Sequence, residues 1–595
     1  MRSLRPFLDR LRTRGELLEV EAPVDPRLEL AEIHRRVAAV GGPALLFRRV
    51  GTSPFPVVTN LFGTPARIEL AFGRRPERLV RELATAVRTL LPPSPRTLWA
   101  ARRLLREAFR VGLATRRSGP VLEVVEQPPR LDRLPALTLW PEDGGPFITL
   151  ALVYTEHPET RQHNLGLYRL QVYDSSTTGM HWQIGKGGGF HYAVAEGRGE
   201  ALPVTAFLGG PPALVLAAIA PLPEPVGELL LASLLLGERL PLVPSPVGPH
   251  RLVAEAEFAL VGRVPPRVRR PEGPFGDHYG YYSLRHDYPV FEVEATVRRR
   301  DAIYPATVVG KPRQEDFHIG NYLQTLLAPL FPLVMPGVRD LWSYGDAGFH
   351  SLAAAVVAER YPREAMTSAF RILGEGQLAL TKVLLVTDTP QDLRDFPRLL
   401  EHLLARVRWE RDLFVLPNLS MDTLDYTGPE VNRGSKAIVL GVGDPVRTLP
   451  RAFAGEPPAD VRGVAPFCAG CLVVAGRPYA EDPEQPARLA RHPAFAGWPL
   501  LVLADDLAPA RSAARFLWQV FTRFEPAADL HAAAAEVART HLVRRGPIAI
   551  DARMKPAYPK EVEPAPETVR LVDRRWREYF PERDPLALGT GEMTV

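Results

Sequence analysis

Cysteine, lysine and uninterrupted apolar stretches are scarce in this sequence of 595 residues. Two cysteines cannot form a disulfide framework, and the N-terminus lacks the apolar core of a signal peptide, so the sequence predicts a cytoplasmic protein. The longest uncharged run, 201–223, is interrupted by Gly209-Gly210-Pro211-Pro212. This interruption predicts a short strand and a helix of about ten residues rather than a transmembrane segment.

Recognised nucleotide and zinc motifs are also absent: the sequence has no Walker loop, no dinucleotide-binding glycine motif and no zinc-protease helix motif. The net charge of +5 is small for this length. The arginines between Arg75 and Arg117 have the helical spacing of a solvated helix face, so no nucleic-acid partner is expected. Cys468 and Cys471 have the spacing of a redox pair but no thioredoxin-like setting, and we interpret them as structural thiols.

Only six of the 73 basic residues are lysines, so nearly every positive charge is an arginine. A lysine that is kept against this bias is a candidate for a role that needs a compact ammonium group, although chance is the alternative. Lys186, Lys311 and Lys436 lie in glycine- or proline-containing contexts, Gly185-Lys-Gly-Gly-Gly189, Gly310-Lys-Pro312 and Gly434-Ser-Lys436. Glycine backbone lets an ammonium and neighbouring N–H groups approach a phosphate, which makes these positions candidate anion contacts.

The pattern of elements predicts an α/β (α+β) protein with four domains. Helical and strand patterns alternate in residues 1–117, short β-rich runs joined by glycine and proline turns fill 118–305, and α/β alternation returns in 306–480. The central runs favour a barrel-like sheet over a doubly wound one. Residues 481–595 are predicted to be a further α/β extension, and no internal repeat is recognised.

The most informative stretch is Glu272-Gly-Pro-Phe-Gly-Asp-His-Tyr-Gly-Tyr-Tyr282, which places two carboxylates, Glu272 and Asp277, in one glycine- and proline-containing turn. Such a pair is a general acid/base candidate, because a rigid loop fixes direction and neighbouring charge separates the two pKa values. A surface turn is the alternative. Arg169 lies in a predicted strand, where its planar guanidinium could clamp a carboxylate.

Four blocks, at 164–169, 272–282, 300–304 and 434–436, together resemble the UbiD family of decarboxylases, which use prenylated FMN. The blocks occur in the family's order. The resemblance implies a flavin-binding split β-barrel for the central domain. It also implies a catalytic trio in which Arg169 orients the substrate carboxylate, Glu272 pairs with Arg169, and Asp277 is the proton donor.

The resemblance further implies a cofactor and a metal. The implied metal ligands are Asn164 and Glu257, whose hard oxygens suit Mn²⁺ or Mg²⁺, with K⁺ as a further candidate ion. Gly185 departs from the family pattern, because related sequences carry a histidine there that can reach the metal. The implied cofactor-binding residues are Leu167, Tyr168, Arg169, His181, Trp182, Gln183, Lys186, Gly187 and Lys436.

The resemblance implies a non-oxidative, reversible decarboxylase of an aromatic or α,β-unsaturated carboxylic acid, supplied with its cofactor by a flavin prenyltransferase and forming a homo-oligomer. Quinone biosynthesis is the expected setting. A dihydroxynaphthoate of the menaquinone branch ranks first among substrates and a polyprenyl-hydroxybenzoate second. Two alternatives stay open: a metal-dependent hydrolase that uses Asp277, His278, His286 and Asp287, and a non-catalytic flavin-binding protein.

Overall fold

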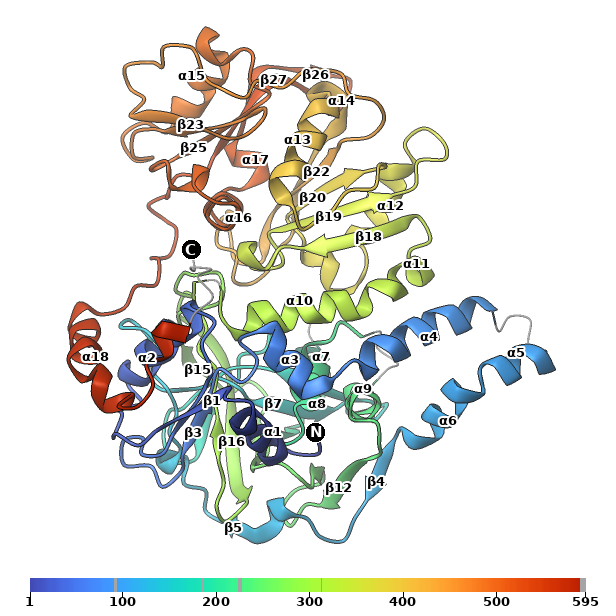
Figure 1. Cartoon of the computed structure of the whole chain (residues 1–595), viewed down its shortest axis with the longest axis vertical. Coiled ribbons are helices and arrows are strands. Elements are labelled where there is room, and N and C mark those ends of the chain that lie inside the picture. Colours follow the sequence, from blue (N-terminus) through green and yellow to red (C-terminus); the bar gives the residue numbers. More distant parts are fainter. Residues whose placement is uncertain (90–93, 184–186, 223–226, 312, 589–595) are drawn as a thin grey trace. The chain divides into compact units, whose positions relative to one another are not determined.

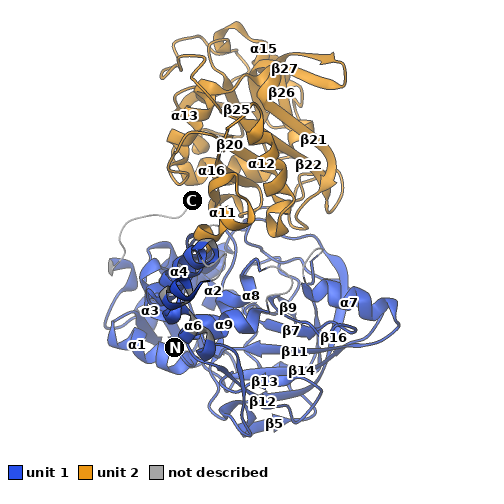
Figure 2. Cartoon of the chain, turned by 90° about the vertical axis from the view of Figure 1, so that its right-hand side faces the viewer, with its two compact units in different colours: residues 1–326, 561–594 blue, residues 327–560, 595 orange. Residues whose placement is uncertain are grey.

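The computed structural model describes residues 1–89, 94–183, 187–222, 227–311 and 313–588. The chain forms two compact units (Figures 1 and 2). Unit 1 comprises Met1–Leu326 and the C-terminal segment that starts at Glu561, and unit 2 comprises Leu327–Lys560. The finer division into four domains stays a prediction. Among the described residues, no helix has both the length and the apolar character that a membrane crossing requires.

The N-terminal part of unit 1 is a small α/β layer. Its sheet has the order β1-β2-β3-β17, and β1 and β2 are parallel. Helix α1 buries Leu4, Phe7, Leu8 and Leu11, which are positions i, i+3, i+4 and i+7 and therefore share one face. The elements are α1 (Leu4–Thr13), β1 (Leu17–Val20), α2 (Glu29–Ala39), β2 (Ala44–Phe47), β3 (Val57–Thr59), β17 (Tyr304–Pro305) and, in the C-terminal segment, α18 (Pro566–Tyr579). The arginine-rich region that follows β3 is helical, as its spacing predicts: α3 (Pro65–Phe72), α4 (Arg75–Thr89), α5 (Pro95–Ala100) and α6 (Arg102–Arg110).

The central part of unit 1 is an eight-stranded, antiparallel sheet that remains open. Its path is β10-β16-β14-β11-β7-β8, and β5 and β15 pair with β16 outside this path. The sheet agrees with the predicted β-rich split barrel, and three helices are inserted between its strands. The elements are β5 (Val124–Glu126), β7 (Leu152–Glu156), β8 (His163–Leu167), β10 (Thr177–Gly179), α7 (Gly187–Gly197), β11 (Leu202–Leu208), α8 (Ala213–Ile219), α9 (Glu228–Leu236), β14 (Phe258–Val264), β15 (Arg269–Glu272) and β16 (His286–Arg298).

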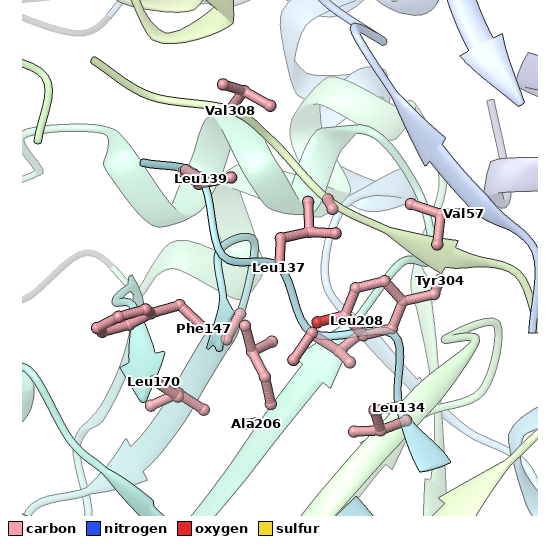
Figure 3. Packing of buried hydrophobic residues seen from close by; sticks show 14 of the residues in the cluster. Val57, Leu134, Leu137, Leu139, Phe147, Leu170, Ala206, Leu208, Tyr304 and Val308 are labelled. Carbon is pink, nitrogen blue, oxygen red and sulfur yellow. The ribbon is translucent and has the colours of Figure 1, made fainter. Parts of the chain in front are cut away.

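One hydrophobic core joins the two parts of unit 1 (Figure 3). Val57 and Tyr304 enter it from the small sheet, Leu208 comes from the central sheet, and Leu137 and Phe147 come from the connecting chain. All five are at most 1% exposed. Because burying an aliphatic or aromatic side chain of this size contributes about 1.5–3 kcal/mol, this core is a rigid support for the strand ends that carry the candidate site.

Unit 2 contains two five-stranded sheets of the same design. The first has the order β18-β19-β20-β22-β21 and the second has the order β23-β24-β25-β27-β26. In both, the outer pairs are antiparallel and the central pairs are parallel. The first set is β18 (Val338–Ser343), β19 (Leu352–Val357), α12 (Glu364–Leu373), β20 (Val383–Thr387), α13 (Phe396–Arg406), α14 (Trp409–Asp412), β21 (Leu413–Ser420) and β22 (Arg433–Leu440). The second set is β23 (Gly463–Cys468), β24 (Cys471–Ala475), α15 (Gln485–Arg491), β25 (Leu500–Ala504), α16 (Ala513–Arg523), α17 (Pro526–Asp529), β26 (Leu530–Ala538) and β27 (His541–Asp551).

Each strand and each of these helices in the first set therefore has a counterpart in the second. We call residues 338–441 repeat 1 and residues 463–552 repeat 2. The expectation that the chain has no internal repeat is wrong. The sequences have diverged because a buried strand or helix face accepts many apolar residues of suitable size, so topology outlasts residue identity.

Candidate active site

The end of β15 and the loop after it carry the two predicted carboxylates, Glu272 and Asp277. β15 ends at Glu272, and Gly273 follows with a φ of 91°, a conformation that favours glycine. Two side chains hold the loop backbone: Gly273 N–H donates to Gln171 Oε1 at 2.8 Å, and Gly276 N–H donates to Asp143 Oδ1 at 2.8 Å. The turn is thereby fixed from β9 (Leu170–Gln171) and from the chain before the central sheet.

The predicted trio is brought together around Arg169, which lies between β8 and β9. Arg169 Nε donates to Glu272 Oε1 at 2.8 Å and Nη2 donates to Glu272 Oε2 at 3.1 Å, which is a bidentate pair. Nη1 of the same guanidinium donates to Asp277 Oδ2. Glu272 is 0% exposed and Asp277 is 9% exposed. One buried cation therefore bridges two carboxylates that are distant from it in sequence.

The charges of this trio decide its protonation. Burial by itself would raise the pKa of Glu272, but the charges of Arg169 and His181 outweigh it and hold that pKa well below its usual range. Burial opposes ionisation of Asp277 too, yet Arg169 and His278 lower its pKa to about 2. Both groups are thus carboxylates at neutral pH in this arrangement. Asp277 can donate a proton only after its contact with Arg169 has weakened.

Two further neighbours of the trio, Phe275 and Ser283, were not singled out from the sequence, and His278 was considered only as a ligand of the hydrolase alternative. Ser283 Oγ accepts from Arg169 Nη2 at 3.1 Å, and the guanidinium carbon lies 4.6 Å from the centre of the Phe275 ring. His278 donates its backbone N–H to Asp277 Oδ1 at 2.7 Å, and its Nδ1 lies 2.8 Å from the same oxygen. Phe275 and His278 belong to the 272–282 stretch and Ser283 follows it, so the stretch itself was the available signal.

Asn164 lies at a second polar position, beside Glu228. Its Nδ2 donates to Glu228 Oε1 at 3.1 Å, and Leu165 N–H donates to Glu228 Oε2 at 3.0 Å. Asn164 Oδ1 is buried without a hydrogen-bond partner in the part of the chain that the structure describes. Burial raises the pKa of Glu228, and the hydrogen bonds that its carboxylate accepts from Asn164 and Leu165 come from neutral N–H groups. An amide oxygen and a carboxylate side by side form a donor set that suits Mn²⁺ or Mg²⁺.

Glu257, the second ligand implied by the resemblance, is not brought to Asn164. It lies just before β14, whereas Asn164 is on β8, and strands β11 and β7 separate these two in the sheet. The Glu257 carboxylate is instead paired with Arg5 at 3.2 Å and Arg299 at 3.4 Å, and it accepts from Ile303 N–H at 2.9 Å. Glu228 was missed because it opens the leucine-rich helix α9, where a sequence reading sees only apolar burial.

The predicted cofactor residues of unit 1 that the structure describes line the same region. A Cβ on Gly187, the first residue of α7, would lie 2.6 Å from Asn164 Nδ2, and one on Gly188 would lie 2.7 Å from Trp182 Nε1 and 3.3 Å from the Tyr168 hydroxyl. Only glycine at positions 187 and 188 therefore leaves the space beside Asn164, Trp182 and Tyr168 free. Trp182 Nε1 is buried without a partner among the described residues. His181 Nδ1 lies 3.2 Å from Glu272 Oε2. The other two predicted cofactor residues are neighbours along the chain: Leu167 is the last residue of β8, and Gln183 follows Trp182. Gly185 and Lys186 lie outside the described residues.

Lys436 belongs to unit 2, where it lies on β22. Its Nζ donates to the Thr381 carbonyl at 2.9 Å, and burial lowers its pKa to about 8. The neighbouring Lys382 forms a buried ion pair with Asp425, with Nζ 2.7 Å from Oδ2. A second lysine that was kept against the arginine bias is therefore part of the same buried cluster.

The ligands required by the hydrolase alternative do not gather. Among the described residues, no group of three or more histidine, cysteine, aspartate or glutamate side chains is placed to hold a metal ion. Asp277 is instead engaged by Arg169 and His278. The geometry gives no support to hydrolysis through Asp277, His278, His286 and Asp287.

Comparisons with known proteins agree with this geometry. Three family models match the chain: the 3-octaprenyl-4-hydroxybenzoate carboxy-lyase N-terminal domain (UbiD_N) over residues 8–87, the Rift-related domain (UbiD) over 113–312 and the C-terminal domain (UbiD_C) over 317–441. A Chlamydia pneumoniae protein, named as one of the subunits of a 4-hydroxybenzoate decarboxylase, is 51% identical over 585 residues, which is 98% of this chain and 99% of the relative.

Solved structures are similar as well. The UbiD-class enzyme HmfF from Pelotomaculum thermopropionicum, in complex with FMN, is 27% identical with a TM-score of 0.61, and the match covers 75% of this chain and 95% of HmfF. An evolved dimeric form of HmfF in complex with prFMN is 25% identical with the same TM-score, over 76% and 97%. Vanillic acid decarboxylase from Sedimentibacter hydroxybenzoicus shares the fold, at 24% identity and a TM-score of 0.66 over 77% and 96%.

Proposed function

The chain belongs to the UbiD family of carboxy-lyases, and we propose that it catalyses the non-oxidative, reversible decarboxylation of an aromatic or α,β-unsaturated carboxylic acid with prenylated FMN. The observation that supports this most is the buried guanidinium of Arg169 between the carboxylates of Glu272 and Asp277. Loss of CO₂ from an sp² carbon leaves an electron pair without a low-energy site. Prenylated FMN, when bound, supplies the electron sink.

Arg169 and Asp277 have complementary tasks in this proposal. A substrate carboxylate competes with Asp277 for the Nη1 side of the guanidinium, which orients the substrate. Asp277 then loses its contact with Arg169, whose charge lowers the pKa of Asp277, while the burial that raises this pKa remains, so Asp277 can take up a proton and deliver it to the product carbon. Glu272 keeps both hydrogen bonds to Arg169 and stays ionised, which holds the guanidinium in place.

The neighbouring residues suit the cofactor and its metal. In the proposal, Asn164 and Glu228 hold Mn²⁺ or Mg²⁺, which neutralises the phosphate of the cofactor, and Glu228 replaces Glu257 in this role. The N-terminus of α7 is an additional favourable site for a phosphate. The remaining cofactor contacts stay as predicted from the family: Leu167, Tyr168, Arg169, His181, Trp182, Gln183, Lys186, Gly187 and Lys436.

A hydroxylated aromatic acid is the proposed substrate class. The matching family model is described as a 3-octaprenyl-4-hydroxybenzoate carboxy-lyase, and the name of the Chlamydia pneumoniae relative refers to 4-hydroxybenzoate decarboxylase. That relative matches nearly the whole chain, including the C-terminal extension, whereas the match to HmfF covers three quarters of this chain. We keep a dihydroxynaphthoate of menaquinone synthesis as the first candidate, with a cytoplasmic homo-oligomer and a flavin prenyltransferase as cofactor supplier.

The test is to produce the protein with and without a co-expressed flavin prenyltransferase, record its absorption spectrum, and measure CO₂ release from a panel of aromatic acids. The panel includes 4-hydroxybenzoate, vanillate and dihydroxynaphthoates. We expect a flavin chromophore and CO₂ release that both depend on the prenyltransferase. A chromophore without CO₂ release from any acid would favour the non-catalytic alternative, and a colourless protein would contradict the proposal.

A further inference from the structure

Repeat 1 and repeat 2 correspond strand by strand, down to the hydrogen bonds between strands. Ala437 N–H donates to the Lys382 carbonyl at 2.8 Å where β22 joins β20. At the same place in repeat 2, Ile548 N–H donates to the Pro499 carbonyl at 3.1 Å. The registers agree, because Val383 pairs with Ala437 and Leu500 pairs with Ile548. Equivalent positions in the two repeats can therefore be assigned without ambiguity.

The stretch from β20 to the start of β21 and its counterpart from β25 to the start of β26 are the best preserved. Residues 383–413 and 500–530 align without a gap, and eight of the 31 positions are identical. Asp395 and Ser512 occupy equivalent positions and cap the N-termini of α13 and α16. Asp412 and Asp529 each accept the N–H of the residue four positions earlier, at 3.0 and 2.7 Å. Two equal local motifs at one spacing point to duplication of a single domain.

The two repeats share one apolar core on their inner faces. The outer face of repeat 1 packs under α12, with Ala365, Ala369 and Ile372, and the outer face of repeat 2 packs under α15, with Leu489 and Ala490. The inner faces and the helices α13 and α16 form a single cluster. Phe396 of α13 lies 5.8 Å from Phe516 of α16, measured between ring centres. The matching faces of the two copies thus face each other.

The contacts across this shared core are reciprocal. Trp409 of α14 donates from Nε1 to the Pro499 carbonyl at 3.1 Å, and a Cβ on Gly546 would lie 2.6 Å from its ring. In return, Ala527 N–H of α17 donates to Ser435 Oγ at 2.8 Å. Helices α14 and α17 are equivalent, and so are the positions of Gly546 and Ser435. In each repeat, this short helix thus contacts the equivalent strand position of the other repeat. Such reciprocal contacts are expected of two copies related by a twofold axis.

The repeats differ in charge at the edge where β20 and β22 begin. Repeat 1 has Lys382 and Lys436 there, and Lys382 is paired with Asp425. Repeat 2 has Pro499 and Pro547 at the two lysine positions, which removes both ammonium groups. The same fold therefore forms without this buried ionic cluster. Repeat 1 alone has kept the lysine that the family resemblance assigns to the cofactor.

We propose that repeat 2 is a built-in, non-catalytic partner of repeat 1. Repeat 2 covers the inner face of repeat 1, on which a second copy of the chain would otherwise pair. Without repeat 2, the ring of Phe396, which lies 5.8 Å from that of Phe516, and the side chain of Leu404, which a Cβ on Gly470 would meet at 3.4 Å, would form an exposed hydrophobic surface that favours association. The family models that match the chain end at residue 441, before repeat 2 begins. The full-length chain therefore does not self-associate through this face.

The test cuts repeat 2 free in the folded, full-length protein. Protease recognition sequences are inserted after Gly455 and after Pro556, which are both exposed, and the cleaved protein is examined by gel filtration and native mass spectrometry. We expect the excised repeat 2 to stay bound in a 1:1 ratio. With Trp409→Ala, we expect the excised repeat 2 to dissociate at least tenfold faster. Phe370→Ala is the matched control: Phe370 is 55% exposed on α12, and its replacement should leave the dissociation rate unchanged.

Once repeat 2 has left, the remaining protein should form assemblies with twice as many chains, because its α13 face is uncovered. Should Trp409→Ala fail to fold, Gly546→Ala perturbs the same contact from repeat 2 and is expected to act in the same way. The proposal is overturned if repeat 2 dissociates on cleavage while Trp409 is intact, or if the remaining protein keeps its original assembly size after release.

Discussion

The replacement Asp277→Asn tests the central role in the proposed reaction. In the structure, Asp277 Oδ2 accepts from Arg169 Nη1, and Oδ1 accepts the backbone N–H of His278 and lies 2.8 Å from its Nδ1. Asparagine has nearly the same shape but offers one oxygen and one NH₂ group. The NH₂ group of asparagine must face either Arg169 or His278, which both donate, so one charge-assisted hydrogen bond is lost. The amide also cannot act as a proton donor to the product.

These losses have different sizes. Losing a hydrogen bond to a charged group costs about 1.5–3 kcal/mol of stability. Arg169 still keeps its bidentate pair with Glu272, so we expect the variant to fold. Removing a general acid lowers turnover by about 10²–10⁴-fold. The expected effect on turnover is therefore far larger than the effect on folding.

The assay compares cofactor content by absorbance, CO₂ release, and incorporation of deuterium from D₂O into the product. Asp277→Asn should retain the cofactor and lose both turnover and proton exchange, while Asp277→Glu, which keeps a carboxyl group, should recover part of both. Asp287→Asn is the matched control, because the same change is made there on an exposed strand position. Unchanged turnover in Asp277→Asn would refute the assignment of Asp277 as the proton donor.

Three further predictions concern other buried groups of unit 1. Glu228→Gln should lower the bound Mn²⁺ or Mg²⁺ measured by elemental analysis at least tenfold, whereas Glu257→Gln should leave it unchanged; equal metal content in both would exclude Glu228 as a ligand. Gly187→Ala places a Cβ 2.6 Å from Asn164 Nδ2 and should reduce flavin absorbance per chain, and full flavin content would contradict the close approach. Burial lowers the pKa of His34 to about 3, so the unfolded chain binds a proton first below pH 6.5 and stability is lost as the pH falls from 6.5 towards 3. Protonation of His34 in the unfolded chain lowers the free energy of unfolding by ~2 kcal/mol at pH 5. His34→Leu should therefore reduce the difference in unfolding free energy between pH 7 and pH 5, measured by urea unfolding, by that amount. The same difference in the variant and the original protein would refute this prediction.

The catalytic stretch is where local sequence was most informative. Glycine and proline between Glu272 and Asp277 predict a turn, and a turn of this length places both carboxylates in one region whatever the rest of the chain does. Arg169, about a hundred residues earlier, was a candidate carboxylate clamp by its residue type, and the family resemblance added its pairing with Glu272. Only the structure shows that one guanidinium bridges both carboxylates and keeps them ionised.

The choice between Glu228 and Glu257 shows where a sequence reading fails. Both lie in largely apolar stretches of sequence, and neither has a local pattern that indicates its partner. Long-range packing decides: α9 brings Glu228 to Asn164, and α1 brings Arg5 to Glu257. Side-chain pairing between segments far apart in the chain depends on the sheet order, which residue spacing does not encode.

By itself, the sequence determined the α/β class, the arginine-rich helices and the family, because periodicity, turn residues and short motifs are local properties. The tertiary structure alone decided which carboxylate lies beside Asn164 and that residues 463–552 repeat the topology of residues 338–441. Repeat 2 retains the strand order and the reciprocal contacts of repeat 1 while its residues have changed, since a core requires apolar side chains of suitable volume and tolerates many sequences. Repeat 2 forms the same sheet with prolines at the positions of Lys382 and Lys436, and this contrast appears only when the two sheets are compared.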